Sequence, residues 1–227
     1  MINELSKRII TSIVLISLLA LTFFYTYILI ILLIIISIIA WIEFNGLITK
    51  IFNKKNLKNR SIIAVYRLSS LLYLLIFSIV VFDGIAYGIT QIGPNSKLNI
   101  IFLFLICILS DIGGLIFGRI FKGKRLTKIS PNKTISGSIG SIVLSMILVP
   151  IFYFTFEEFN NLLNLISLSF VVCIICQLGD LLISYLKRKA KVKDTGDLLP
   201  GHGGILDRID GILFAVPFGL ILLKFLQ

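Results

Sequence analysis

Long apolar stretches recur along nearly the whole chain, and each is long enough to cross a bilayer as a helix. Crossing the hydrocarbon takes roughly 17 to 25 mostly apolar residues, because every backbone polar group must be bonded within the segment. We expect about seven such spans, with about six and eight as the limits. Their expected ranges are 9–25, 27–44, 61–82, 98–118, 136–156, 162–186 and 204–226. The pattern predicts an all-α, multi-pass integral membrane protein.

Composition supports this fold class. Of the 227 residues 57% are hydrophobic and only 15% are charged, and the mean hydropathy is +1.03, which excludes an ordinary soluble domain. The first apolar run follows two basic residues, as a secretory signal would, but no small-residue cleavage pattern comes after it. We therefore expect residues 1–60 to form an uncleaved membrane hairpin and a basic loop.

Basic residues collect in the loops on one side of the predicted membrane. They cluster at 7–8, 50–60, 119–133 and 187–193, and the opposite side receives few charges. By the positive-inside rule the amino terminus and these loops are cytoplasmic. The net charge of +11 is thus concentrated on one face, where it suits anionic lipid headgroups and phosphates. The cluster at 50–60 lacks accompanying acids and glycines, so we assign it a topological role only.

The segment from Ser184 to Asp210, SYLKRKAKVKDTGDLLPGHGGILDRID, combines cations and carboxylates with the only histidine of the chain. Its cations can face an anion, and its carboxylates can hold a hard cation through oxygen ligands. The cations are Lys187, Arg188, Lys189, Lys191 and Lys193, and the carboxylates are Asp194, Asp197, Asp207 and Asp210. The combination is suited to a metal-bound polyphosphate.

Helical spacing brings several of these groups onto common faces. Asp180, Ser184 and Lys187 are spaced i, i+4 and i+7, which gives either a functional face or a structural salt bridge. Asp207 and Asp210 are one turn apart and can share a ligand. Carboxylates at a membrane boundary are costly without a cation or substrate. With Asp180 they predict an oxygen-ligand site for Mg²⁺, which commonly bridges a few carboxylates to substrate phosphates.

A second polar segment lies between Ser110 and Ser141. Asp111 lies within an apolar span, where a carboxylate needs a cavity, a cation or a partner. Gly114 and Gly118 share its helical face, either beside a site or for close helix packing. Further along, Ser130 and Lys133 lie on a turn before a predicted helix start, where backbone amides favour an anion.

The segment from Ser184 to Asp210 resembles the signature of the phosphatidate cytidylyltransferases, also called CDP-diacylglycerol synthases. The serine, the lysine–arginine pair, the lysine–aspartate pair, LLPGHGG and the final DRxD all appear in register. A weaker block, SD followed by GR and then SPxKT, also resembles the family. Two positions depart from it: Ser136 replaces a frequent acid, and Gly114-Leu115 replaces a frequent Ala-Tyr pair. The chain is also short for the family, so we expect a trimmed amino-terminal part.

The resemblance implies an enzyme of phospholipid biosynthesis that joins CTP to phosphatidate, giving CDP-diacylglycerol and pyrophosphate. It makes residues 61–227 the catalytic region of a single membrane domain and needs no protein nucleophile. It also implies one or two Mg²⁺ ions, the second of which can be another cation. The implied catalytic residues are Asp180, Asp207, Lys187 and Lys193, and the implied metal ligands are Asp180, Asp207 and Asp210. The implied phosphate-binding residues are Ser130, Lys133, Arg188, His202 and Arg208, with Arg119 for the lipid phosphate.

The implied partners are the two substrates and membrane lipids, without nucleic acid, and a homodimer is compatible with them. The expected location is a bacterial inner membrane with the active site at its cytoplasmic face. One alternative is a CTP-dependent transferase acting on another lipid or a polyprenyl acceptor. Another is a transporter that uses Asp111, Asp180 and Asp207 as an ion pathway, although the chain shows no internal repeat. Cys107, Cys173 and Cys176 lie in apolar spans, so we expect buried thiols and no disulfide.

Overall fold

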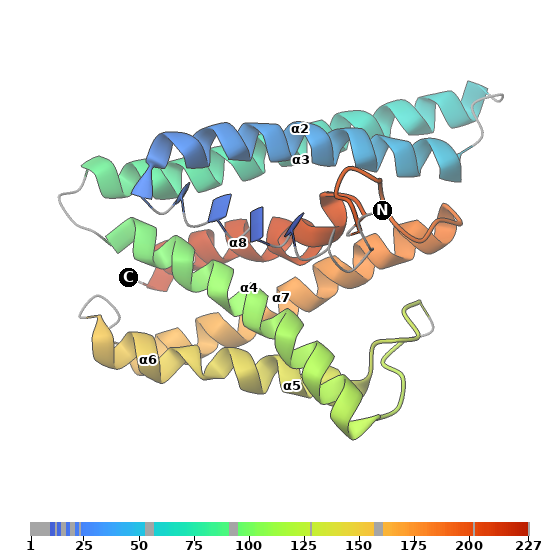
Figure 1. Ribbon diagram of the computed structural model, residues 1–227. Coiled ribbons are helices and arrows are strands. Elements are labelled where there is room, and N and C mark those ends of the chain that lie inside the picture. The colour runs from blue at the N-terminus through green and yellow to red at the C-terminus, as the bar shows by residue number, and fades with distance from the viewer. Residues whose placement is uncertain are drawn as a thin grey trace. The chain divides into compact units, whose positions relative to one another are not determined.

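The computed structural model is helical throughout its described residues, apart from turns and loops (Figure 1). It describes residues 24–52, 57–90, 95–127, 129–156, 161–201 and 203–226, together with 10, 11, 13, 14, 17, 18, 21 and 22. The helices are α2 (Thr26–Ile51), α3 (Leu57–Thr90), α4 (Asn95–Phe121), α5 (Ile135–Met146), α6 (Leu148–Thr155), α7 (Leu162–Lys189) and α8 (Leu206–Leu226). Over these ranges the only extended pairings are isolated bridges, Arg125 with Thr134 and Leu199 with Gly203.

Six segments of the described chain are long and apolar enough to cross a membrane. They are Tyr27–Ile51, Asn59–Gly84, Leu98–Phe121, Ile135–Thr155, Leu162–Lys189 and Leu206–Leu226. They correspond one to one with the last six predicted spans, whereas the structure describes only part of the first predicted span, 9–25. The prediction of a multi-pass, all-α membrane protein is confirmed.

The fifth predicted span is a pair of helices rather than one. Helix α5 ends at Met146 and α6 begins at Leu148, with Ile147 in a turn whose amide donates to the carbonyl of Leu144 at 3.3 Å. Pro150 accounts for the break, because it has no amide hydrogen for the carbonyl of Met146 and its ring crowds that carbonyl.

Contacts divide the chain into two compact units, and each is described by itself. The first comprises 1–79 and 186–209, and the second comprises 80–185 and 210–227. The amino-terminal hairpin region 1–60 therefore shares a unit with the charged segment that follows α7. The division into 1–60 and a catalytic 61–227 stays a prediction.

In the first unit, α2 and the first part of α3 form an antiparallel hairpin (Figure 1). The hydroxyls of Ser37 and Ser78 are 3.2 Å apart, and the indole of Trp41 donates to the carbonyl of Arg67 at 3.3 Å. One face of α2 leaves isoleucines at 31, 34, 38 and 42 exposed, as expected for contact with lipid. The opposite face buries Ala40, Glu43 and Leu47. Glu43 is the one carboxylate among them.

In the second unit, α4 and α5 cross at glycines. A Cβ atom on Gly113 would lie 2.5 Å from the carbonyl oxygen of Gly140, and one on Gly140 would overlap the ring of Phe117. Close helix packing is thus one role of the glycines between Ser110 and Ser141, which is one of the two roles that the sequence suggested for glycines of this segment. The three cysteines are free and buried, which confirms the prediction for Cys107, Cys173 and Cys176.

Candidate active site

The loop between α4 and α5 is held by a tight turn that places Lys133. The amide of Lys133 donates to the carbonyl of Ser130 at 3.1 Å, and Pro131 takes the second position of the turn, where its fixed φ is favourable. The carbonyl of Lys133 in turn accepts from the amide of Leu126 at 2.7 Å. Both backbone groups of Lys133 are therefore anchored, so its side chain leaves the loop from a defined point.

Helix α5 begins directly after this loop and is capped by Thr134. The threonine hydroxyl accepts from the amide of Gly137 at 3.0 Å, and the amide of Ile135 donates to the carbonyl of Lys124 at 2.9 Å. These amides already have acceptors in the protein. The amides of Ile135 and Gly137 are therefore engaged within the protein at the helix start where an anion was expected.

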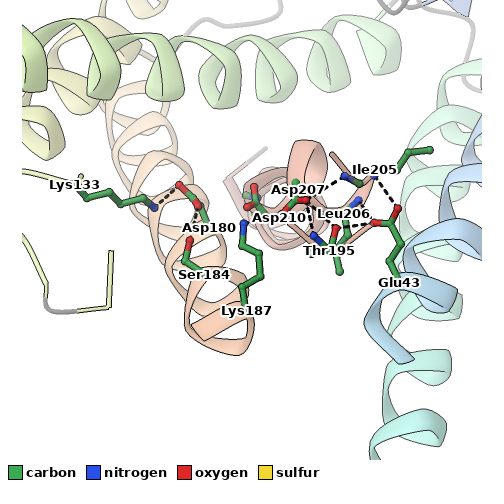
Figure 2. Close-up of polar contacts among 12 residues, drawn as sticks. Glu43, Lys133, Asp180, Ser184, Lys187, Thr195, Ile205, Leu206, Asp207 and Asp210 are labelled. Atoms are coloured by element: carbon green, nitrogen blue, oxygen red, sulfur yellow. Dashed lines mark hydrogen bonds and ion pairs between the residues drawn. The ribbon is translucent and has the colours of Figure 1, made fainter. Parts of the chain in front are cut away.

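A cavity of about 590 Å³ lies in the second unit, between the α4–α5 loop and α7. Lys133 forms an ion pair with Asp180 of α7, and the hydroxyl of Ser184 donates to the other oxygen of Asp180 at 3.3 Å (Figure 2). The side chains of Lys133 and Asp180 are 25% and 29% exposed, so both remain accessible to a ligand. The wall contains Ser110, Asp111, Gly114, Leu115, Gly118, Arg119, Leu126, Ser130, Asn132, Lys133, Thr134, Gly137, Ser138, Ser141, Gln177, Asp180, Leu181 and Ser184.

Neutral polar groups form part of the same wall. The hydroxyl of Ser138 donates to the side-chain carbonyl of Gln177, whose NH₂ group donates to the Ser138 backbone carbonyl at 3.4 Å. Ser141 donates to the carbonyl of Ser110 at 2.6 Å. The cavity wall thus offers two carboxylates, Asp111 and Asp180, two cations, Arg119 and Lys133, and a set of hydroxyl and amide groups. Sequence reasoning had assigned no role to Gln177.

A second cluster of charges lies in the first unit and is centred on Asp207. Lys187, in the last turn of α7, places its ammonium 2.6 Å from Oδ1 of Asp207. Oδ2 accepts from the amide of Thr195 at 2.8 Å, from its hydroxyl at 3.0 Å and from the amide of Gly204 at 3.2 Å. Both oxygens of Asp207 are therefore bound by the protein, and Asp207 pre-orders the start of α8.

Glu43 of α2 completes this cluster, and sequence reasoning missed it. It is 7% exposed, and its carboxylate accepts from the amides of Ile205 at 3.0 Å and Leu206 at 2.9 Å and from the hydroxyl of Thr195 at 2.8 Å (Figure 2). Amides at a helix start attract negative charge, and here two carboxylates of the protein fill that role.

The loop leading to α8 turns tightly at its glycines. Leu199 and Gly203 exchange two backbone hydrogen bonds, of 2.9 and 3.1 Å, across the tip of the loop. Gly201 and Gly203 adopt φ values of +77° and +80°, a region where glycine is favoured. His202, between them, lies outside the described residues.

The structure distributes the predicted site residues over both units. Ser130, Lys133, Arg119 and Asp180 line the cavity of the second unit, and Lys187 pairs with Asp207 in the first. The cation partner of Asp180 is Lys133, so the predicted face of α7 does not form its own salt bridge between Asp180 and Lys187. Of the other predicted site residues, Arg188, Lys193 and Arg208 are exposed, whereas Asp210 is buried with Oδ1 accepting from the Gly211 amide at 2.9 Å.

The donor chemistry decides where a magnesium ion would fit. No group of three or more His, Cys, Asp or Glu side chains within the described ranges is placed to hold a metal ion. Mg²⁺ commonly uses one or two carboxylates and completes its shell with water and substrate phosphates. Asp180 suits this mode because it lies in the cavity wall and is partly exposed. A cation at Asp207 would have to share or replace the Lys187 contact, and the predicted set of Asp180, Asp207 and Asp210 stays a prediction.

Comparison with known proteins agrees with this chemistry. The family model described as the Cytidylyltransferase family matches residues 45–226. The chain is similar to proteins named phosphatidate cytidylyltransferase from Staphylococcus haemolyticus, at 48% identity, and from Staphylococcus saprophyticus and Staphylococcus aureus, each at 46%. Each similarity extends over 126 residues, 55% of this chain and 48% of the relative, so the chain spans about half the length of the curated relatives it matches. With most of its length matched by the family model, the chain belongs to the cytidylyltransferase family.

Proposed function

We propose that the protein is a phosphatidate cytidylyltransferase, which converts CTP and phosphatidate to CDP-diacylglycerol and pyrophosphate. The observation that carries the proposal is the cavity in which Lys133 and Asp180 meet, within a chain of the cytidylyltransferase family. The names of the similar staphylococcal proteins support the same substrates. The apolar helices support a lipid substrate, since they are long and apolar enough to cross a membrane.

The reaction joins two anions, and the main task of the protein is to let them meet. An oxygen of the lipid phosphate attacks the α-phosphorus of CTP, a new P–O bond forms, and the bond to the β-phosphate oxygen breaks to release pyrophosphate. Lys133 and Arg119 in the cavity wall supply positive charge for these phosphates, and Ser130 supplies a hydroxyl. Lys133 can exchange its ion pair with Asp180 for a substrate phosphate, because both side chains are accessible.

Asp180 would hold the magnesium ion, with Asp207 and Asp210 as further candidate ligands on α8. When bound, the ion supplies Lewis-acid polarisation of the α-phosphate and balances negative charge on the pyrophosphate. With the ion and CTP bound, Asp180 would face the cation and Lys133 would face a substrate phosphate, in place of their ion pair with each other. If Asp207 also held the ion, its contact with Lys187 would be shared or replaced.

The expected location is the inner membrane of a bacterium, with the site at the cytoplasmic face. The support is the accumulation of basic residues in the loops at 50–60, 119–133 and 187–193, which by the positive-inside rule are cytoplasmic. CTP is a cytoplasmic nucleotide, so a site that opens to the cytoplasmic face can bind it directly.

The test is a transfer assay with purified protein in detergent. Phosphatidate, Mg²⁺ and CTP labelled at the α-phosphate are incubated with the wild type, with Asp180→Asn and with Asp197→Asn, a control at an exposed carboxylate of the described loop. The expected result is label in the lipid phase with an equal amount of pyrophosphate, strongly reduced in Asp180→Asn at the same Mg²⁺ concentration and kept in Asp197→Asn. Folded wild type that labels no lipid contradicts the proposed reaction, and label only with another lipid phosphate contradicts the assignment of phosphatidate.

A further inference from the structure

A buried carboxylate of α2 is bound to the loop and helix start that hold Asp207. Glu43 is 7% exposed and lies just before residues 45–226, the part matched by the family model. Burying a carboxylate is costly unless hydrogen bonds replace its hydration. Three donors do so here: the hydroxyl of Thr195 and the amides of Ile205 and Leu206. All three belong to the segment that positions Asp207.

Thr195 connects the two carboxylates directly. Its amide donates to Oδ2 of Asp207 at 2.8 Å, and its hydroxyl lies 2.8 Å from Glu43 and 3.0 Å from the same Asp207 oxygen. One hydroxyl proton is thus shared by two carboxylates. A change in the position of Glu43 therefore moves Thr195, which holds one oxygen of Asp207.

The surrounding backbone is built closely around Glu43. A Cβ atom on Gly196 would lie 2.7 Å from Oε1 of Glu43, and one on Gly204 would overlap Oε2 and the hydroxyl of Thr195. The loop can approach the carboxylate this closely only without side chains at these two positions. The contact is therefore a specific feature of this loop and not a chance result of helix packing.

We infer that Glu43 is a positioning residue for Asp207, a role that rests on the proposed function of Asp207 in cytidylyl transfer. Glu43 fixes Thr195 and the amides of residues 205 and 206, and these fix Asp207 opposite Lys187. Glu43 is not among the residues that line the cavity of the second unit. Its loss should therefore lower the rate of turnover without weakening the binding of CTP.

Glu43→Gln is the first variant, because it keeps the side-chain size while putting an NH₂ group where an oxygen accepts. We expect kcat to fall 10- to 100-fold, the KM for CTP to stay within twofold of wild type, and the amides of residues 203–206 to exchange hydrogen faster. Ser37→Ala is the control, since it removes a hydrogen bond between α2 and α3 that does not involve the Asp207 cluster. Equal losses of kcat in the two variants would assign the effect to the packing of α2 and overturn the inference.

Thr195→Val is the second variant and removes only the shared hydroxyl. It should lower kcat as well, and the double variant Glu43→Gln/Thr195→Val should be no slower than the slower single variant, because both changes act through one contact. If the fold decreases in kcat of the two single variants multiply in the double variant, Glu43 does not act through Thr195 and the inference fails. If Glu43→Gln does not fold, Thr195→Val alone still tests the inference, because a normal kcat in this variant would show that the hydroxyl shared with Glu43 does not position Asp207.

The assays separate this inference from the proposed reaction. If the wild type transfers no cytidylyl group, the proposed function fails, and the hydrogen exchange of residues 203–206 still tests the contact. Faster exchange in Glu43→Gln but not in Ser37→Ala supports the positioning of the helix start, and unchanged exchange overturns it. If the wild type is active and Glu43→Gln has normal kcat, the inference fails while the proposed function stands.

Discussion

The ammonium of Lys187 lies 2.6 Å from Oδ1 of Asp207 and joins the last turn of α7 to the first turn of α8. Their side chains are only 14% and 6% exposed. Another ion pair, between Lys224 and Asp83, has a similar distance of 2.5 Å but side chains that are 56% and 54% exposed. The two ion pairs therefore have similar distances but differ in burial. Burial decides how much each pair contributes to the free energy of unfolding.

Removing one partner should reveal this difference in the free energy of unfolding. Lys187→Ala leaves a buried carboxylate without its cation and should destabilise the protein by about 3 kcal/mol or more. Lys224→Ala should cost no more than about 1 kcal/mol. Thermal unfolding in detergent measures both, and equal shifts in Tm would show that Asp207 is hydrated despite its low exposure.

Asp207→Asn should remove most turnover while the protein still inserts into the membrane. The amide keeps the shape of the side chain but loses the negative charge that faces Lys187, and we expect kcat to fall by about 100-fold or more. Transfer of labelled CMP to lipid is the measurement, with Asp197→Asn as the exposed control. Substantial activity in Asp207→Asn would remove this residue from the catalytic group.

Lys133→Ala should weaken the use of CTP, since it removes a cation from the cavity wall. A loss of 10- to 100-fold in kcat/KM corresponds to about 1.4 to 2.7 kcal/mol, a reasonable value for one charged phosphate contact. Lys124→Ala is the matched control, because Lys124 is an exposed residue of the same loop outside the cavity wall. The measurement is steady-state kinetics with varied CTP. Equal kcat/KM values for the two variants would contradict the assignment of Lys133 as a phosphate-binding residue.

Chelation should stop the reaction, and added Mg²⁺ should restore it. The proposed contact with Asp180 further predicts that Asp180→Asn needs more Mg²⁺ for half-maximal rate, because one oxygen ligand with its charge is lost. Pyrophosphate release during a magnesium titration measures this. Full activity of the wild type in excess chelator would reject a metal-dependent reaction.

The crossing of α4 and α5 should tolerate no added methyl group. Gly113→Ala places Cβ 2.5 Å from a backbone oxygen of Gly140, so the helices must separate, at a cost of about 1 to 3 kcal/mol. Gly46→Ala is the matched change in α2, where no atom lies within 4 Å of the added Cβ. It should stabilise the helix by up to about 1 kcal/mol. Equal Tm values for the two variants would contradict this packing.

The helices were predictable because length and apolar content alone decide whether a segment can span a membrane. The ends of the helices were less predictable. Helix α2 continues to Ile51 and α7 to Lys189, whereas the predicted spans ended at 44 and 186. Polar residues can continue a helix beyond the hydrocarbon, and hydropathy does not detect this. The break before α6 could have been placed from Pro150 by its missing amide hydrogen.

The site was only partly predictable. Lys133 and Asp180 were both named from the sequence, yet their pairing depends on how the α4–α5 loop turns. Glu43 was missed because its partners Thr195 and Leu206 lie more than 150 residues away along the chain. One signal was available: Glu43 is a carboxylate within an apolar run, and such a residue needs a partner.

The close approach of Gly196 and Gly204 to Glu43 has a consequence for how this sequence can diverge. A side chain at either glycine position would displace the carboxylate, and a shorter residue at position 43 would leave the start of α8 without its acceptor. Substitutions at positions 43, 196 and 204 are therefore expected to occur together. A viable descendant that changes one of them must change the others in the same lineage, although α2 and this loop are separated by most of the gene.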